Sequence, residues 1–197
     1  MKVILVDSMS QNIHPAVEGR YHLTMGLGRF TGAITTGAIF AIRNGTSKLM
    51  LITRLVLQGG FSGVGNAQTT QIIQVKRFSA ATHSGGASLL TSVGKHSTTM
   101  PASTLLDARQ ATISGTSPLT DTSVVYEAPA FNTILPRSLS GMSELHWQGQ
   151  QHAELVLQPS EGLAVFITET AVAGDSIVGL VCWGEVTPGA GNIGGPT

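Results

Sequence analysis

Residues 38–60, AIFAIRNGTSKLMLITRLVLQGG, decide the fold class. Two apolar runs rich in β-branched residues flank Asn44 and Gly45, a dipeptide that accepts the positive φ angles of a two-residue hairpin turn. This pattern predicts a β-hairpin of two long strands. In the second run both alternating sets of side chains are largely apolar, which predicts a strand covered on one face by the core and on the other by a neighbouring element or subunit.

Strand patterns continue on both sides of this stretch. Residues 69–80 predict another strand, and residues 153–186 predict three strands, with turns at 159–162 and 173–175. Residues 102–111 are the one place where a short helix fits, with Ser103 as its N-cap. The chain has no internal repeat and no sustained helical period. We therefore expect an all-β protein, a jelly-roll β-sandwich.

The length of 197 residues suits one domain. Residues 1–22 begin with a short apolar run, KVILV, that could be a strand, and continue polar and without a period. We interpret them as an extended N-terminal arm, with a plain surface loop as an equal alternative. Residues 23–187 form the predicted jelly-roll domain. Residues 188–197 are a glycine-rich C-terminal tail whose composition predicts disorder.

Charge is scarce in this chain. Charged residues make up 11% of it and the formal net charge is zero, whereas an ordinary soluble domain has about 25% charged residues. This composition gives no electrostatic reason to bind nucleic acid or anionic lipid, and it favours neutral, shape-matched contacts. No apolar run is long enough for a membrane span or a signal peptide, so we expect a soluble protein made in a cytoplasm.

The stretch GLGRFTG, with Gly26, Gly28 and Gly32, resembles a dinucleotide-binding turn only superficially. Such a turn needs a helix to leave it, and the β-branched residues that follow form a poor helix. We expect no cofactor here. The glycines instead predict a hinge between the arm and the core strands, where another backbone, that of a neighbouring subunit, lies close.

No enzyme or metal site is predicted. The six histidines contain no metal-binding spacing, and His146 and His152 are interpreted as surface residues that flank a turn. Cys182 has an apolar setting and is interpreted as a buried small hydrophobic residue. Glu144 and Glu154 could meet across a hairpin as a glycosidase pair, but ordinary charges on strand edges explain them equally well.

The apolar pair of runs at 38–61, the strand and loop IIQVKRFSAATHSGGA at 72–87 and the closing SIVGLVCWGEV at 176–186 resemble the jelly-roll structural proteins of tailed bacteriophage virions. These include trimeric capsid decoration (cement) proteins, some of tumour-necrosis-factor-like arrangement. The resemblance covers about residues 20–187 as a pattern and carries no catalytic residue. It implies a homo-oligomer, a trimer, that binds the major capsid protein or another virion protein on the capsid surface after assembly in the host cytoplasm.

For such a role we expect no catalytic, cofactor or metal residue. The alternative is a carbohydrate- or receptor-binding jelly roll of a phage tail or fibre, with Trp147, Tyr21 or Tyr126 as sugar platforms. The residues predicted to meet a partner are Tyr21, Arg29, Arg54, Phe61, Trp147 and Trp183.

Overall fold

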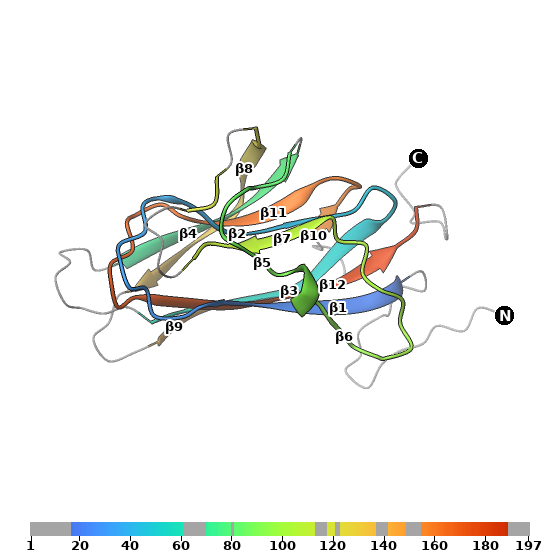
Figure 1. Cartoon of the computed structure of the whole chain (residues 1–197), viewed down its shortest axis with the longest axis horizontal. Helices are drawn as coiled ribbons and strands as arrows, with labels where there is room; N and C mark the ends of the chain where they lie inside the picture. Colours follow the sequence, from blue (N-terminus) through green and yellow to red (C-terminus); the bar gives the residue numbers. More distant parts are fainter. Residues whose placement is uncertain are drawn as a thin grey trace.

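The computed structural model describes residues 17–60, 70–79, 81–112, 118–120, 123–136, 142–148 and 155–188. Two antiparallel sheets pack face to face as a β-sandwich (Figure 1), which confirms the all-β prediction. The first sheet contains β1 (Val17–Leu27), β3 (Leu49–Gly60), β6 (Gly94–Lys95), β9 (Met142–Gln148), β10 (Leu155–Leu157) and β12 (Ser176–Val186). The second contains β2 (Gly37–Arg43), β4 (Thr70–Ser79), β5 (Ala87–Ser88), β7 (Asp107–Gln110), β8 (Val125–Pro136) and β11 (Gly162–Ile167).

The long strands pair in a nested order. The first sheet runs β10-β3-β12-β1-β6, with β9 also paired to β3, and the second runs β5-β7-β2-β11-β4-β8. Thus β1 pairs with β12, β2 with β11, β3 with β9 and β10, and β4 with β8, all antiparallel. Each of the four long strands of the first half of the chain, β1 to β4, therefore has a partner from the second half.

The hairpin predicted at Asn44 and Gly45 is wrong, because β2 and β3 lie in different sheets. Asn44 is buried, and its Nδ2 donates to the carbonyls of Lys48 at 2.6 Å, Leu157 at 3.2 Å and Gln158 at 3.1 Å. The amide thus satisfies three carbonyls where the chain turns a corner between the sheets. A turn-forming pair specifies a change of direction, but these long-range bonds decide where the next strand goes.

A β-bulge at Thr53 changes which side chains of β3 face the core. Cys182 of β12 lies opposite Arg54, but Trp183 lies opposite Ile52, so Thr53 is an extra residue in the ladder. Simple alternation would put Ile52 and Leu55 on opposite faces, whereas both are buried in the core. Thr53 and Arg54 are both exposed instead.

Two further boundaries differ from expectation. The short helix predicted at 102–111 is absent, because residues 107–110 form β7 and pair with β2. The arm predicted to end at residue 22 is also too long, since β1 begins at Val17 and the Tyr21 side chain is fully buried. Residues 1–16 and most of the predicted tail, residues 189–197, lie outside the described residues.

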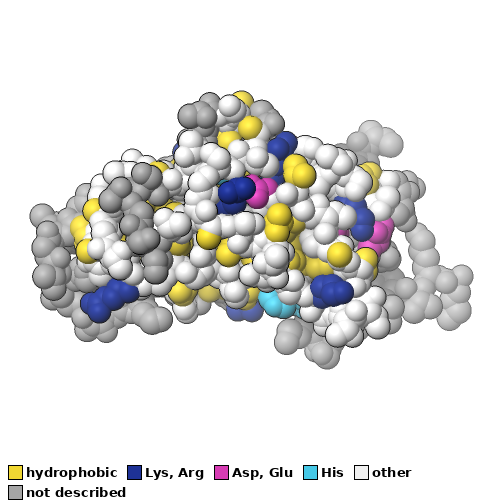
Figure 2. Space-filling view, in the orientation of Figure 1, with side chains coloured by type: hydrophobic (Ala, Val, Ile, Leu, Met, Phe, Trp, Pro, Cys, Tyr) yellow, Lys and Arg dark blue, Asp and Glu magenta, His cyan; other side chains and the backbone are white. Residues whose placement is uncertain are grey.

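The main core lies between the two sheets. A separate and smaller cluster of buried apolar residues includes Ala38, Ala41 and Ala164. Figure 2 shows one face of the molecule, on which dark blue and magenta side chains are scattered singly or in pairs among uncharged ones. In the part of the chain that the structure describes, no helix has the length and hydrophobicity of a membrane span.

Candidate functional site

A buried carboxylate, Glu185, lies at the centre of the densest polar cluster described. It follows Trp183 by two residues on β12, so strand alternation points both side chains into the sandwich. Glu185 and Trp183 are 0% and 1% exposed. A buried carboxylate is costly unless it is paired and hydrogen-bonded, so the partners of Glu185 decide its role.

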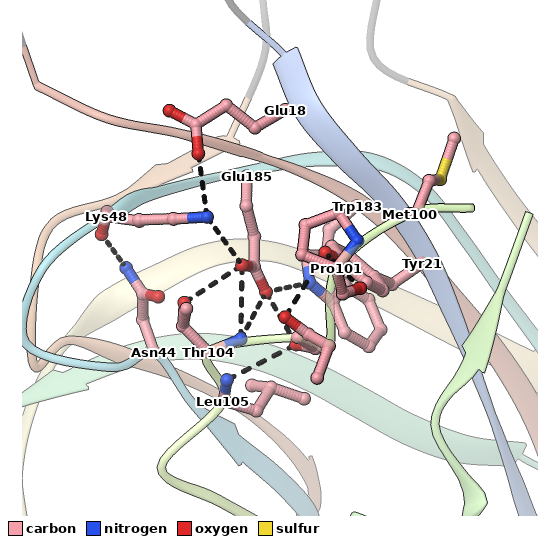
Figure 3. A network of polar contacts seen from close by, with 12 residues as sticks. Glu18, Tyr21, Asn44, Lys48, Met100, Pro101, Thr104, Leu105, Trp183 and Glu185 are labelled. Atoms are coloured by element: carbon pink, nitrogen blue, oxygen red, sulfur yellow. Dashed lines mark hydrogen bonds and ion pairs between the residues drawn. The ribbon is translucent and has the colours of Figure 1, made fainter. Parts of the chain in front are cut away.

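Donors from three segments surround the Glu185 carboxylate (Figure 3). Oε1 accepts hydrogen bonds from Ser103 Oγ at 2.5 Å, Thr104 N at 2.9 Å and Trp183 Nε1 at 3.3 Å. Oε2 accepts from Thr104 Oγ1 at 2.9 Å, and Lys48 Nζ lies 3.9 Å from it. Four hydroxyl or N–H groups match the roughly four lone-pair positions of a carboxylate. The hydrogen-bonding capacity of Glu185 is therefore used by the chain itself.

Tyr21 closes the same cluster from β1. Its ring centroid is 5.7 Å from that of Trp183, and its hydroxyl donates to the carbonyl of Pro101 at 3.1 Å. Burial, together with the negative charges of Glu185 and Glu18, raises the pKa of Tyr21 to about 12. The phenol is thus a neutral hydrogen-bond donor and holds its proton throughout the physiological range.

The cluster fastens residues 96–106, which we call the strap, to the end of the sandwich. Besides the bonds to Glu185 and Tyr21, the His96 amide donates to the Arg20 carbonyl at 3.0 Å. Lys95 Nζ donates to the Met100 carbonyl, also at 3.0 Å. These contacts explain the absence of the predicted helix, because the Ser103 hydroxyl bonds Glu185 and not a helix N-terminus. We interpret the cluster as a structural clamp.

A second cluster of aromatic side chains surrounds Tyr126. The Tyr126 and Phe166 rings meet edge to face with centroids 4.8 Å apart, and Tyr126 Oη lies 2.6 Å from His83 Nε2. Lys76 Nζ lies 4.5 Å from the Phe166 centroid, a cation–π contact. Tyr126, one of the predicted sugar platforms, is therefore half-buried against other rings.

Of the predicted partner residues, the structure brings Tyr21 and Trp183 together, in the core. Tyr21 and Trp183 are core residues, so their predicted interface role is wrong: neither ring reaches the surface. Arg29 and Arg54 are exposed, one just after β1 and the other in the middle of β3. Phe61 lies outside the described residues. The backbone of Trp147 lies in β9 opposite Leu55, but its side chain is outside what is described.

The side chains of the predicted glutamate and histidine pairs are not described. The backbones of Glu144 and His146 lie in β9, whereas Glu154 and His152 fall outside the described residues. Among described residues, no group of three or more acidic, histidine or cysteine side chains is placed to hold a metal. Cys182 is partly buried, and burial raises the pKa of its thiol against the opposing effect of Arg54.

Sequence reasoning missed the clamp because its parts are far apart in the chain. Ser103 and Thr104 are separated from Glu185 by 82 and 81 residues. The available signal was an acidic residue two positions after a core tryptophan, on the same face of a strand. That signal predicts a buried carboxylate but does not identify its donors.

Comparisons with known proteins give little similarity. No family model matches the chain, and no curated protein matches it. A solved structure of infectious bursal disease virus, strain Gx, matches at 14% sequence identity and a TM-score of 0.16. The match covers 95% of this chain and 45% of the viral chain. Strain Gt matches with 12% identity, 96% and 47% coverage and a TM-score of 0.12. The chain thus spans less than half the length of these viral chains, and similarity this low carries no argument.

Proposed function

We propose that this protein is a structural virion protein, a jelly-roll homo-oligomer that decorates a phage capsid and stabilises it. The nested pairing of β1 with β12, β2 with β11, β3 with β9 and β10, and β4 with β8 carries this proposal. A long antiparallel hairpin rolled into two sheets produces this order, and the jelly roll is a fold of capsid and lectin domains. The step from fold to function is an analogy at the level of the fold.

Two features of the molecule support a structural role. The polar groups around Glu185 find their hydrogen-bond partners within the cluster, and they fasten the strap to the sandwich. Such an arrangement suits a rigid building block. The sparse charge favours contacts through shape and apolar surface. In such a trimer, contacts between subunits and with the capsid would bury surface that rupture must expose again, at about 25 cal/mol per Å² of apolar area. Repeated over a shell, small contacts add up.

The test is to purify the protein and to compare particles with and without it. We expect a trimer by analytical ultracentrifugation, and we expect complete particles to survive heat and osmotic shock better than particles that lack the protein. A monomer that leaves particle stability unchanged would refute the proposal. Binding on a glycan array that Trp147→Ala abolishes would support the carbohydrate-binding alternative instead.

A further inference from the structure

Four basic or titratable side chains gather where β6 meets β1: Arg20, His22, Lys95 and His96, which we call the cationic cluster. On β1 the odd-numbered residues Tyr21 and Leu23 point into the core, so Arg20 and His22 point outward. His22 pairs with Gly94, and a Cβ on Gly94 would overlap the His22 ring. That ring therefore lies across β6, where it meets His96 edge on with centroids 5.3 Å apart.

The cationic cluster has no described counter-charge. The one carboxylate of β1, Glu18, is 2.8 Å from Lys48 Nζ. Within the described residues, no ion pair involves any member of the cationic cluster; Arg77 pairs with Glu127, and Arg109 pairs with Asp107.

The outer side of β1 continues from the cationic cluster into an uncharged surface. Thr24, Gly26 and Gly28 are exposed, and a Cβ added to either glycine would meet no atom within 4 Å. Leu180 lies opposite Thr24, and Val178, 39% exposed, lies opposite Gly26. The strand thus presents cations at one end and open, partly apolar surface at the other. We call the two together the β1 outer face.

We propose that the β1 outer face docks an extended segment of a partner protein, with carboxylates over the cationic cluster and small apolar side chains over Gly26 and Gly28. Charge complementarity defines the carboxylate end, and the open space above the glycines defines the other end. A nucleic acid fits less well, because the cationic cluster holds only one arginine and one lysine and the nearby large aromatics, Tyr21 and Trp183, are buried.

Docking will tighten as the pH falls, because a bound carboxylate favours protonated histidines. His96 faces His22 and Arg20 of β1, and Lys95 precedes it in the chain. From the strap, Met100 contacts Arg20 and Lys95. Cys182 lies opposite His22, and Arg54 lies opposite Cys182. Burial, His22 and Arg20 lower the pKa of His96 in the free chain. A bound anion would offset the repulsion between protonated His96 and its neighbours His22 and Arg20.

The inference depends on this face of one chain and not on the shell role, so each can fail alone. The probe is a fluorescein-labelled peptide EEEGVTVTV, measured by anisotropy with the full chain. We expect saturable binding at least about tenfold tighter at pH 5.5 than at pH 8, the change expected for one unit of pKa difference. The peptide QQQGVTVTV should bind at least about tenfold more weakly than EEEGVTVTV at pH 5.5.

Variants locate the site. Arg20→Gln should weaken binding several-fold, and the double variant His22→Gln with His96→Gln should remove the pH dependence. Arg77→Gln, which removes a basic residue of β4, is the matched control and should bind like the parent chain. Cys182, the one cysteine of the chain, provides an independent readout, because bound peptide should slow its alkylation.

Three results would overturn the proposal. The first is no saturable binding of EEEGVTVTV at either pH together with unchanged alkylation of Cys182. The second is equal binding by the double histidine variant and the parent chain at both pH values. The third is tighter binding of a short oligothymidylate than of the peptide, which would make the site one for nucleic acid.

Discussion

At the scale of single residues, Glu185 shows how one side chain fixes a segment that has no regular structure. The strap contributes both a hydroxyl and a backbone amide to the carboxylate, through Ser103 and Thr104. These donors are worth more as a set than singly, because each is partly buried and needs an acceptor. The part of the strap at Ser103 and Thr104 is therefore held by one residue of β12.

We expect Glu185→Ala to lower the free energy of unfolding by about 3 kcal/mol or more, since several buried donors lose their acceptor at once. Urea unfolding followed by circular dichroism measures this. Glu127→Ala is the matched control: Glu127 forms an ion pair with Arg77 in which both side chains are about half exposed, and such pairs contribute less than about 1 kcal/mol. Equal losses in the two variants would contradict the clamp.

The glycines of GLGRFTG illustrate what a motif does and does not predict. Gly26 belongs to β1, so the predicted hinge between an arm and the core is wrong at that position. Gly26 and Gly28 face open space, whereas Gly86, with a φ of 61°, has the Gln110 carbonyl where a Cβ would go. Only the last of these needs glycine for reasons within the chain.

Gly26→Ala should therefore change stability by less than about 1 kcal/mol, and a small gain is expected from the stiffer unfolded chain. Gly86→Ala should cost about 1–3 kcal/mol, because it adds an overlap to a strained backbone angle. Thermal unfolding of the two variants makes the comparison. A large loss in Gly26→Ala alone would mean that the open space is needed by the folded chain.

At the scale of elements, sequence patterns located strands but not their partners. Alternation and β-branched residues predicted the runs that became β2, β3, β4 and β12. The hairpin was wrong because Asn44 finds carbonyls at Lys48, Leu157 and Gln158, and two of these lie more than a hundred residues away. Local turn propensity cannot encode such bonds. Strict alternation also fails in β3, because the bulge at Thr53 puts Ile52 and Leu55 on the same face.

Deletion of Thr53 tests the bulge. Without it Ile52, Arg54 and Leu55 alternate regularly, and every core side chain keeps its face, so we expect a folded chain that loses about 1 kcal/mol. Deletion of Val56 reverses the faces of Leu57 and all later residues of β3, and it should prevent cooperative folding. Circular dichroism melts of the two deletions measure the difference; similar melts would refute the assignment.

The short ladder between β1 and β6 should respond to pH. Burial, His22 and Arg20 lower the pKa of His96 in the folded chain, so the unfolded chain takes up a proton first as the pH falls. The free energy of unfolding should therefore drop below about pH 6.5 and level off below the folded pKa. His96→Gln should reduce the drop between pH 7.5 and pH 5 in urea titrations. An undiminished drop would assign the effect to other groups.

At the scale of the whole molecule, composition and strand patterns were sufficient to predict an all-β sandwich. They were insufficient to place the N-terminal boundary of the domain, because β1 begins within a stretch that is polar and has no period. Val17–His22 reads as irregular, yet it pairs with β12 and places Tyr21 beside Trp183. The clamp and the nested order also depend on contacts between distant segments, which a local pattern does not contain.

A chain that begins at Leu23 should lose at least about 3 kcal/mol of stability, since it lacks Tyr21 and the Glu18–Lys48 pair. A chain that begins at Val17 is the matched comparison and keeps every contact described here. Guanidinium unfolding of both chains tests the boundary. If the two unfold at the same midpoint, the first six residues of β1 contribute nothing and the original boundary stands.

The position of β1 between β12 and β6 has a consequence for synthesis. The ribosome makes β1 before the other described strands, but its partner β12 begins only at Ser176. Until then β1, whose apolar face carries Leu23, Met25 and Leu27, can pair only with the two-residue strand β6. High contact order of this kind slows folding and leaves strand edges exposed to aggregation. We therefore expect a larger fraction of the synthesised chain to fold when a chaperone is present, or when expression is slowed at low temperature.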